Sequence, residues 1–422
     1  MTPLQVAAVA LITALVIIIG LNFVPPEKKV ERNVEHSRGH EDEQIVRELS
    51  VLLGPPILDG CNVRALQDGD EIFPAMLDAI RAARRTVTFE SYIYWSGDIG
   101  RAFAAALSER ARANVKVHVL LDWAGSYKVE SKLLAEMTEA GVEIKRFHPL
   151  NWYHLSRMNN RTHRKVLVVD GSVGFTGGVG IAEPWTGHSQ DPDHWRDSHF
   201  EFTGPVVAQA QSVFVDNWIK VTGAVLRGKE YFPSLPPVGT MPAQMFSSSP
   251  TGGSESMQLM YLLTIANATT SIDLAAAYFV PDRLMLRALT AALARGVTLR
   301  IIVPGKHTDS HVVRYASRHS WGELLQAGAQ IHEFQPTMYH CKVLIVDQWL
   351  VSVGSTNFDS RSFRLNAEAS LNVLDRSFAK SLTTVFEKDL ARSRQISLAE
   401  WAKRPLRERF VEVVTAPLSS QL

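Results

Sequence analysis

The residues with the clearest chemical potential form two copies of one short motif. The motif is His-x-Lys-x4-Asp, and its six candidate catalytic positions are His163, Lys165, Asp170, His340, Lys342 and Asp347. In each copy an apolar run with the length of a buried strand separates the Lys from the Asp. Because side chains two positions apart share one face of a strand, each His and its Lys are expected to project together. Two copies in one chain predict a shared site.

A pair of His residues suits a displacement in two steps. One His attacks as a nucleophile, and the other gives a proton to the leaving oxygen. The two Lys side chains supply positive charge for non-bridging oxygens that gain negative charge in the transition state. These properties predict a phosphodiester substrate and require neither a metal nor another cofactor. Within each motif, the Asp is expected to close the strand and brace it rather than to react.

Each His also needs a hydrogen-bond acceptor that orients its ring. Candidate carboxylates lie downstream in both halves: Asp197 is 34 residues after His163, and Glu368 is 28 residues after His340. We therefore expect Asp197 to orient His163 and Glu368 to orient His340. The alternative treats both as surface carboxylates that pair with nearby arginines.

Small residues follow each motif at the same distance. Gly177-Gly178 and Gly354-Ser355 begin seven residues after the Asp of their motif. Small residues let a charged group approach the backbone closely. Gly178 and Ser355 are therefore candidate supporting positions.

Helical and strand patterns alternate along the chain, which predicts an α/β fold. In the first half we expect helices at 73–84, 99–113 and 131–140, and strands at 87–94, 115–121 and 142–147. The same order returns in the second half, with helices at 257–268, 284–294 and 321–327, and strands at 271–279, 297–303 and 329–334. A duplication of this length predicts two similar lobes, each a sheet flanked by helices, related by a pseudo-twofold axis and sharing one active site.

The first 26 residues contain no charged side chain, and residues 4–24 are almost continuously apolar. At the helical rise this segment reaches roughly 30 Å, enough to span a bilayer core. The segment lacks the basic start and the cleavage site of a signal peptide, so we expect an uncleaved transmembrane helix. Lys28, Lys29 and Arg32 follow it. The positive-inside rule then predicts a single-pass anchor in the inner membrane, with the catalytic part on the cytoplasmic side.

Overall composition narrows the possible partners. The 422 residues carry 44 basic and 43 acidic side chains, and a duplex-binding protein usually shows a stronger basic bias, so no nucleic acid is expected as a partner.

The chain has two cysteines, Cys61 and Cys341, which are too few for a disulfide scaffold. Cys341 is expected to be a small buried residue. Residues 188–199 hold several His and Asp residues without a recognised metal-ligand spacing, so we interpret them as a polar loop.

The paired motifs resemble those of the phospholipase D superfamily. Residues 354–368, Gly-Ser-Thr-Asn-Phe-Asp-Ser-Arg-Ser-Phe-Arg-Leu-Asn-Ala-Glu, are similar to its bacterial cardiolipin synthase branch. The resemblance covers about residues 61–386. It implies a metal-independent phosphatidyl transfer through a phosphohistidine, in which two phosphatidylglycerol molecules give cardiolipin and glycerol. It further implies that His163 is the nucleophile, that His340 is the acid/base and that Asn357 supports the site, whereas Gly180 stands at the corresponding place in the first half.

Two other functions stay open at this point. In the first, water replaces the acceptor alcohol and the protein is a phosphodiester hydrolase. In the second, the protein is a catalytically silent tether that binds anionic lipid. The intact His and Lys residues argue against the tether, and the anchor argues against a nuclease. The expected partners are phosphatidylglycerol, other anionic phospholipids and the membrane, while the oligomeric state is not predicted.

The sequence divides into six segments. We expect an anchor at 1–26, a linker and first helix at 27–60, a first lobe at 61–234, a linker rich in Pro, Ser and Gly at 235–253, a second lobe at 254–396, and a C-terminal amphipathic helix and tail at 397–422. That last helix either docks on the protein or lies on anionic lipid. The first half carries ten extra residues, 151–160, which form either a cover for the lipid entrance or a plain solvent loop.

Overall fold

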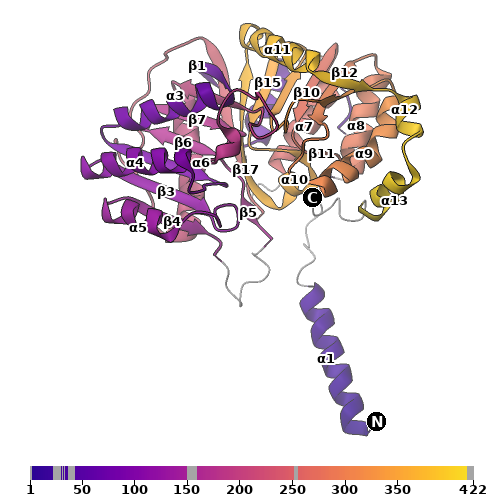
Figure 1. The fold of residues 1–422 in the computed structure, drawn as a ribbon, viewed down its shortest axis with the longest axis horizontal. Helices are drawn as coiled ribbons and strands as arrows, with labels where there is room; N and C mark the ends of the chain where they lie inside the picture. Colours follow the sequence, from indigo (N-terminus) through magenta and orange to yellow (C-terminus); the bar gives the residue numbers. More distant parts are fainter. Residues whose placement is uncertain are drawn as a thin grey trace.

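The computed structural model describes residues 2–21, 30, 32, 34–36, 43–149, 159–250 and 255–415. Two similar α/β lobes lie side by side and share one long sheet (Figure 1). The helix α1 (Pro3–Leu21) stands apart from both lobes. The segment predicted as an anchor is therefore helical in its described part. Among the described residues, however, no helix meets the combined requirement of length and apolar character for crossing a membrane.

The first lobe begins with β1 (Leu58–Gln67) and ends with α6 (Val206–Thr222). Between them lie α3 (Asp68–Ala82), β2 (Thr86–Ser91), α4 (Asp98–Arg112), β3 (Lys116–Asp122), α5 (Ser131–Glu139), β4 (Glu143–Phe147), β5 (Arg161–Thr162), β6 (Val166–Val169), β7 (Val173–Gly177), the short 3-10 helix η2 (Glu183–Trp185) and β8 (Ser198–Thr203). The six helices and strands expected in the first half are all present, with ends that shift by a few residues. The extra loop predicted at 151–160 lies almost entirely outside the described residues.

The second lobe repeats this order from β9 (Met241–Ser248) to α11 (Arg376–Ala391). Between them lie α7 (Ser256–Asn267), β10 (Ser271–Ala276), β11 (Phe279–Val280), α8 (Arg283–Ala294), β12 (Thr298–Pro304), α9 (His311–Gln326), β13 (Gln330–Phe334), β14 (Lys342–Val346), β15 (Leu350–Gly354), β16 (Phe358–Asp359), α10 (Ser360–Arg364) and β17 (Asn366–Leu374). The predicted elements are again present, although α9 begins ten residues earlier than the expected start at 321.

The sheet makes the internal duplication visible. The first-lobe strands run in the order β4-β3-β2-β6-β7-β8-β1, and the second-lobe strands mirror them as β13-β12-β10-β14-β15-β17-β9. In both lobes the strand that carries the His-x-Lys motif is antiparallel to its neighbours. The lobes meet where β1 pairs with β9. This order places the two motif strands at equivalent positions on either side of the pseudo-twofold axis.

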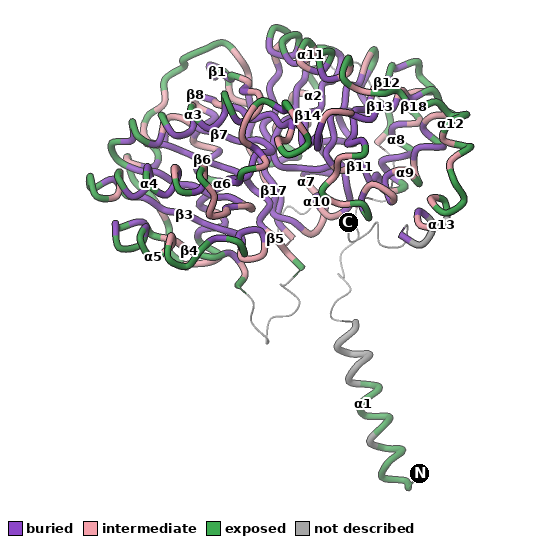
Figure 2. Tube along the Cα trace, viewed as in Figure 1, coloured by how far each residue is buried: buried purple, intermediate pink, exposed green. Residues whose placement is uncertain are grey.

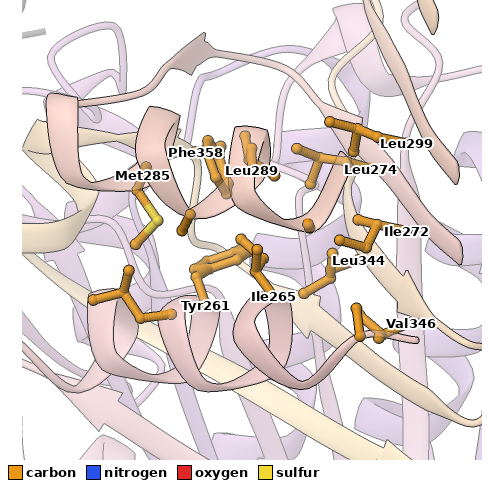
Figure 3. Packing of buried hydrophobic residues seen from close by; sticks show 14 of the residues in the cluster. Tyr261, Ile265, Ile272, Leu274, Met285, Leu289, Leu299, Leu344, Val346 and Phe358 are labelled. Carbon is orange, nitrogen blue, oxygen red and sulfur yellow. The ribbon is translucent and has the colours of Figure 1, made fainter. Parts of the chain in front are cut away.

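Helices cover both faces of the sheet, so its central strands are buried (Figure 2). In β14, Leu344 and Val346 pack with side chains of α7 and α8 (Figure 3), whereas Val343 and Ile345 join a cluster with α11 on the other face. This alternation is the period of two that a strand imposes. Each large aliphatic side chain buried in this way contributes roughly 1.5–3 kcal/mol. The motif strands are therefore rigid supports for the His and Lys residues.

The prediction of a linker at 235–253 was wrong for the central part of this segment. Residues 241–248 form β9, which lies between β1 and β17 in the middle of the sheet. The polar composition misled the prediction because the polar groups are satisfied inside the protein. Gln244, for example, is buried, accepts a hydrogen bond from Asn372 at 3.1 Å and donates one to the carbonyl of Leu49 at 3.0 Å.

The segments that flank the lobes also pack on the second lobe. The predicted first helix is α2 (Glu43–Leu52), and its Ile45 and Leu49 join the core beside α7. After β18 (Ser393–Ile396), α12 (Leu398–Ala402) and α13 (Leu406–Thr415) lie against α9. The Trp401 indole donates to the carbonyl of Arg318 at 2.9 Å. These contacts favour the docking interpretation of the C-terminal helix.

Candidate active site

A cavity of about 320 Å³ lies between the lobes, and both motif histidines line it. His163 and Lys165 reach it from the residues between β5 and β6, and His340 comes from the residues just before β14. The other lining residues are Tyr92, Ile93, Arg161, Trp185, Trp195, Tyr278, Asp309, Ser310, Val313, Asn357, Asp359, Arg361, Ser362 and Asn366. The two motifs therefore converge on one site, as expected.

The opposite lobe holds His163 in place. Its backbone N–H donates to the carbonyl of Ala367 at 2.9 Å, next to the pairing of β5 with β17. Its ring Nδ1 lies 3.0 Å from Oε1 of Glu368. A single short stretch of the second lobe thus fixes both the backbone and the ring of the first-lobe histidine.

The first lobe holds His340 in the same way. Its backbone N–H donates to the carbonyl of Arg196 at 2.8 Å, and its Nδ1 lies 2.7 Å from Oδ2 of Asp197. Each carboxylate directly follows the residue whose carbonyl holds the histidine backbone. Each half-site is therefore completed by the other lobe.

This geometry corrects the predicted pairing. Glu368, and not Asp197, orients His163, and Asp197 orients His340. The prediction chose the carboxylate of the same half, whereas the polypeptide segments pair across the lobe interface. The surface alternative is also wrong, because Asp197 and Glu368 are only 1% and 0% exposed. The neighbouring arginines have other partners: Arg196 pairs with Asp389 and Asp68, and Arg364 pairs with Asp282.

Different groups support the two carboxylates. Glu368 accepts hydrogen bonds from the Ser355 hydroxyl and, at 3.2 Å, from Asn366 Nδ2. Asp197 accepts from the Trp185 indole at 2.9 Å and from the Ser198 N–H at 2.8 Å. These bonds keep each carboxylate turned toward its histidine.

Gly178 is needed for a steric reason. A Cβ atom at this position would lie 2.2 Å from Oδ1 of Asp197. Ser355, its counterpart in the second half, instead reaches its carboxylate with a hydroxyl. At Gly180 a Cβ would lie 2.9 Å from Ile93 and 3.2 Å from Trp185. Trp185 thus crowds the place that corresponds to Asn357 in the second half.

The two lysines are buried beside the histidines. Lys165 Nζ donates to the carbonyl of His163 at 2.9 Å, and Lys342 Nζ donates to the carbonyl of His340 at 2.6 Å. Lys342 Nζ also lies 3.1 and 3.2 Å from the two ring nitrogens of His340. Lys165 lines the cavity, whereas Lys342 is buried against the His340 ring and is not among the lining residues. Two basic side chains at or beside the cavity favour the binding of an anion.

Burial sets the charge state of His163. It lowers the pKa of His163 to about 4, with Lys165 adding to the effect and Glu368 opposing it. Burial alone would raise the pKa of Glu368, but His163 and Lys165 hold it below its ordinary value. At neutral pH the pair is a neutral imidazole and an ionised carboxylate. Because a carboxylate only accepts, Nδ1 carries the proton and Nε2 keeps a free lone pair.

Burial likewise lowers the pKa of the other site bases. The pKa of Lys165 falls to about 7, mainly because the side chain is buried and secondly because of the charge of Lys342. Burial and the charge of Lys342 lower the pKa of His340, while Asp197 opposes them. A bound anion would counter these effects because it stabilises the protonated forms. The site is therefore suited to binding an anion.

The Asp of each motif lies at the far end of its strand and does not line the cavity. The Asp170 carboxylate accepts from the backbone N–H groups of residues 84–86, and that of Asp347 from those of residues 269–271. Both residues have a left-handed φ, 51° and 52°. The expectation that they brace the strand fits these contacts.

Sequence reasoning missed much of the cavity wall. Arg161 and Arg361 bring positive charge, Tyr92 packs edge-on against His163 at 5.1 Å, and Trp185 packs edge-on against His340 at 5.2 Å. Arg361 belongs to the sequence motif at 354–368, but the aromatic residues follow no sequence pattern that marks them.

Cys341 is buried as expected. Among the described residues, no group of three or more His, Cys, Asp or Glu side chains is placed to hold a metal ion.

The fold and the site together define a class. Two lobes with one His–Lys pair each, sharing a cavity, are the arrangement of phospholipase D-like proteins. A family model described as "Cardiolipin synthase, PLD-like domain" matches residues 76–202 and 261–390. The chain therefore belongs to the cardiolipin synthase family of phospholipase D-like proteins.

Individual relatives agree with this assignment. The chain is 34% identical to cardiolipin synthase 2 of Bacillus anthracis over 91% of this chain and 76% of that protein. It is 35% identical to the cardiolipin synthase of Geobacillus thermodenitrificans over 87% of this chain and 74% of that protein. Among solved structures, phosphatidylserine synthase of Haemophilus influenzae matches 90% of this chain and all of that chain, with a TM-score of 0.69 and 14% identity. That likeness shows the fold alone.

Proposed function

We propose that this protein is a phosphatidyltransferase that joins two phosphatidylglycerol molecules into cardiolipin and releases glycerol. The observation that carries the proposal is that His163, Lys165 and His340 line one cavity, and that each histidine is held by a carboxylate of the other lobe. Lys342 is buried in contact with the His340 ring. The names of the relatives support the choice of substrate. Hydrolysis differs only in the acceptor, so it is an alternative outcome of the test below.

In the first step, Nε2 of His163 attacks the phosphorus of the donor lipid. The bond from phosphorus to the glycerol oxygen breaks, and His340 gives its proton to that oxygen. The product is a phosphatidyl group on His163 and free glycerol. The free lone pair on the neutral His163 ring, with Nδ1–H directed to Glu368, supports this direction of attack.

In the second step, a hydroxyl of another phosphatidylglycerol attacks the phosphorus. His340, now neutral, takes the proton of that hydroxyl, and the bond from phosphorus to Nε2 of His163 breaks. Cardiolipin leaves, and both histidines return to their starting states. The same two groups therefore act in both steps with their proton roles reversed.

Basic side chains around the cavity supply contacts for the phosphate. Lys165 and Lys342 are the nearest to the histidines. Arg161 lines the cavity, and its buried Nη1 has no hydrogen-bond partner among the described residues. An unsatisfied donor of this kind is costly unless a ligand oxygen meets it. Arg161 is therefore a third group proposed to hold the phosphodiester.

Membrane attachment through residues 1–26 is part of the proposal. The sequence of this segment is uncharged and largely apolar, and its described part is the helix α1. The basic residues that follow, Lys28, Lys29 and Arg32, support a cytoplasmic position for the catalytic part at the inner membrane. Removing residues 1–26 should release the protein from membranes in a flotation assay with anionic vesicles. Unchanged flotation would contradict the anchor.

The central test uses the full-length protein in mixed micelles with labelled phosphatidylglycerol and no added metal. Cardiolipin and glycerol should form in equal amounts, and both should disappear in His163→Ala and His340→Ala. Phosphatidic acid without cardiolipin would identify a hydrolase. Binding of anionic micelles without turnover would identify the tether.

A further inference from the structure

The active-site cavity contains a carboxylate that the transfer chemistry does not use. Asp309, in the loop between β12 and α9, lines the cavity together with Tyr278 and Ser310. The Tyr278 hydroxyl donates to Oδ2 of Asp309 at 2.5 Å, which fixes the direction of the carboxylate. A phosphodiester gains nothing from a neighbouring carboxylate, because both are anions. Asp309 therefore suits a different part of the substrate.

Asp309 and His340 line the same cavity, and the charge of Asp309 acts on the second half-site. Burial is the main cause that lowers the pKa of His340 and Lys342, and the charge of Asp309 works against it at both residues. The leaving glycerol oxygen and the incoming hydroxyl must both reach His340, because it transfers their protons. The alcohol of either step therefore occupies the cavity that His340 and Asp309 line together.

Other acceptors on the cavity wall also lack donors. Asn357 and Asn366 line the cavity, are 4% and 6% exposed, and have buried Oδ1 atoms without a hydrogen-bond partner among the described residues. A buried acceptor left unpaired costs free energy, so such groups are usually satisfied when a ligand binds. Hydroxyl groups donate, whereas the oxygens of a phosphodiester do not. These unpaired acceptors of the cavity are thus matched to a ligand rich in hydroxyls.

We infer that Asp309, held by Tyr278, forms a subsite for a polyol head group. It accepts a hydrogen bond from a glycerol hydroxyl that is not transferred, both when glycerol leaves and when phosphatidylglycerol attacks. The neighbouring hydroxyl is then held at His340, and the subsite favours a polyol over water or a simple alcohol as acceptor. This inference rests on the proposed phosphatidyl transfer.

The test compares acceptors that compete for the same phosphohistidine. Labelled phosphatidylglycerol is given to the full-length enzyme in micelles with added ethanol, and cardiolipin, phosphatidylethanol and phosphatidic acid are measured together. The product ratios depend only on the second step, so they are independent of the amount of active enzyme. Asp309→Ala should lower the ratio of cardiolipin to phosphatidylethanol by roughly tenfold, because a hydrogen bond to a charged group is lost.

Two further variants sharpen the result. Tyr278→Phe should lower the ratio less, because the carboxylate remains but is no longer fixed. Asp78→Ala, which removes an exposed carboxylate on α3, is the control and should leave the ratio unchanged. If Asp309→Ala slowed all three products alike and left their ratio unchanged, the subsite would be overturned. Asp309 would then act only by favouring the protonated form of His340. If the wild type makes no cardiolipin at all, the proposed function and the subsite both fail.

Discussion

The two half-sites share one backbone plan but differ in what surrounds each imidazole. Tyr92 packs against the His163 ring, and the Lys165 ammonium lies 5.4 Å from the Tyr92 ring. Two tryptophans pack against His340, and Lys342 reaches both of its ring nitrogens. The duplicated fold thus delivers two similar histidines, and the residues around them give each a different environment.

The supports of the two carboxylates differ in the same way. Glu368 is held by a hydroxyl and an amide side chain, whereas Asp197 is held by an indole and a backbone N–H. The comparison teaches that the two half-sites differ mainly in the residues that surround the motifs, and not in the His and Lys residues that the motifs repeat.

The largest effect is expected from removing either histidine, and the leaving group separates their roles. Both His163→Ala and His340→Ala should lower the turnover of phosphatidylglycerol by about 10³-fold or more. With phosphatidyl-p-nitrophenol the leaving oxygen needs no proton. His340→Ala should therefore still release a burst of p-nitrophenol in rapid-mixing experiments, whereas His163→Ala should not. The reverse result would exchange the nucleophile and the acid/base.

A smaller effect, about 10²- to 10³-fold on turnover, is expected from the carboxylates. Because the pairing crosses the lobe interface, Glu368→Gln should impair the burst of p-nitrophenol, and Asp197→Asn should spare it. The double variant His163→Ala/Glu368→Gln should be no slower than His163→Ala alone, since the two residues act as a unit. Once the histidine variants have assigned the nucleophile to His163, a lost burst in Asp197→Asn with a normal burst in Glu368→Gln would mean that each histidine is oriented from its own lobe.

This crossing marks the limit of what the sequence predicts. The repeated motif and the alternating elements are local patterns, and they predicted both lobes and the convergence of His163 and His340. The partner of each histidine is set by pairing between distant segments: His163 and Glu368 are 205 positions apart, and His340 and Asp197 are 143. No local period records such a contact. The same reason explains the missed strand β9, whose polar Gln244 is satisfied by groups from other parts of the chain.

The dependence of kcat/KM on pH tests the charge states of the first half-site. His163 must be neutral to attack, and its pKa is lowered to about 4 by burial, so activity should rise through pH 4 and not through pH 6.5. On the alkaline side two groups must keep their protons: His340, the acid of the first step, whose pKa is lowered by burial, and Lys165, whose pKa is lowered to about 7. We therefore expect kcat/KM to be falling already at pH 7. Outside this window the decline should be about tenfold per pH unit. In the profile of kcat the alkaline limb should move to higher pH, because a bound anion stabilises the charged lysine.

An acid limb near pH 6.5 would contradict the burial argument for His163. Lys165→Arg provides the matched control for the other limb, because a guanidinium keeps its charge across this range. If the variant retains activity, its alkaline decline should begin at higher pH than in the wild type. An unchanged alkaline limb would mean that His340, and not Lys165, sets this limb.

The smallest effect is expected from Ser355, whose hydroxyl supports Glu368. Ser355→Ala should slow the p-nitrophenol burst by roughly tenfold, since one hydrogen bond to a charged group is lost. Gly178→Ala is the matched variant of the other half. Its new Cβ would lie 2.2 Å from Oδ1 of Asp197, so it should disturb Asp197 and slow the turnover of phosphatidylglycerol while the burst remains. Equal effects of both variants on the burst would show that the two supports do not act on separate histidines.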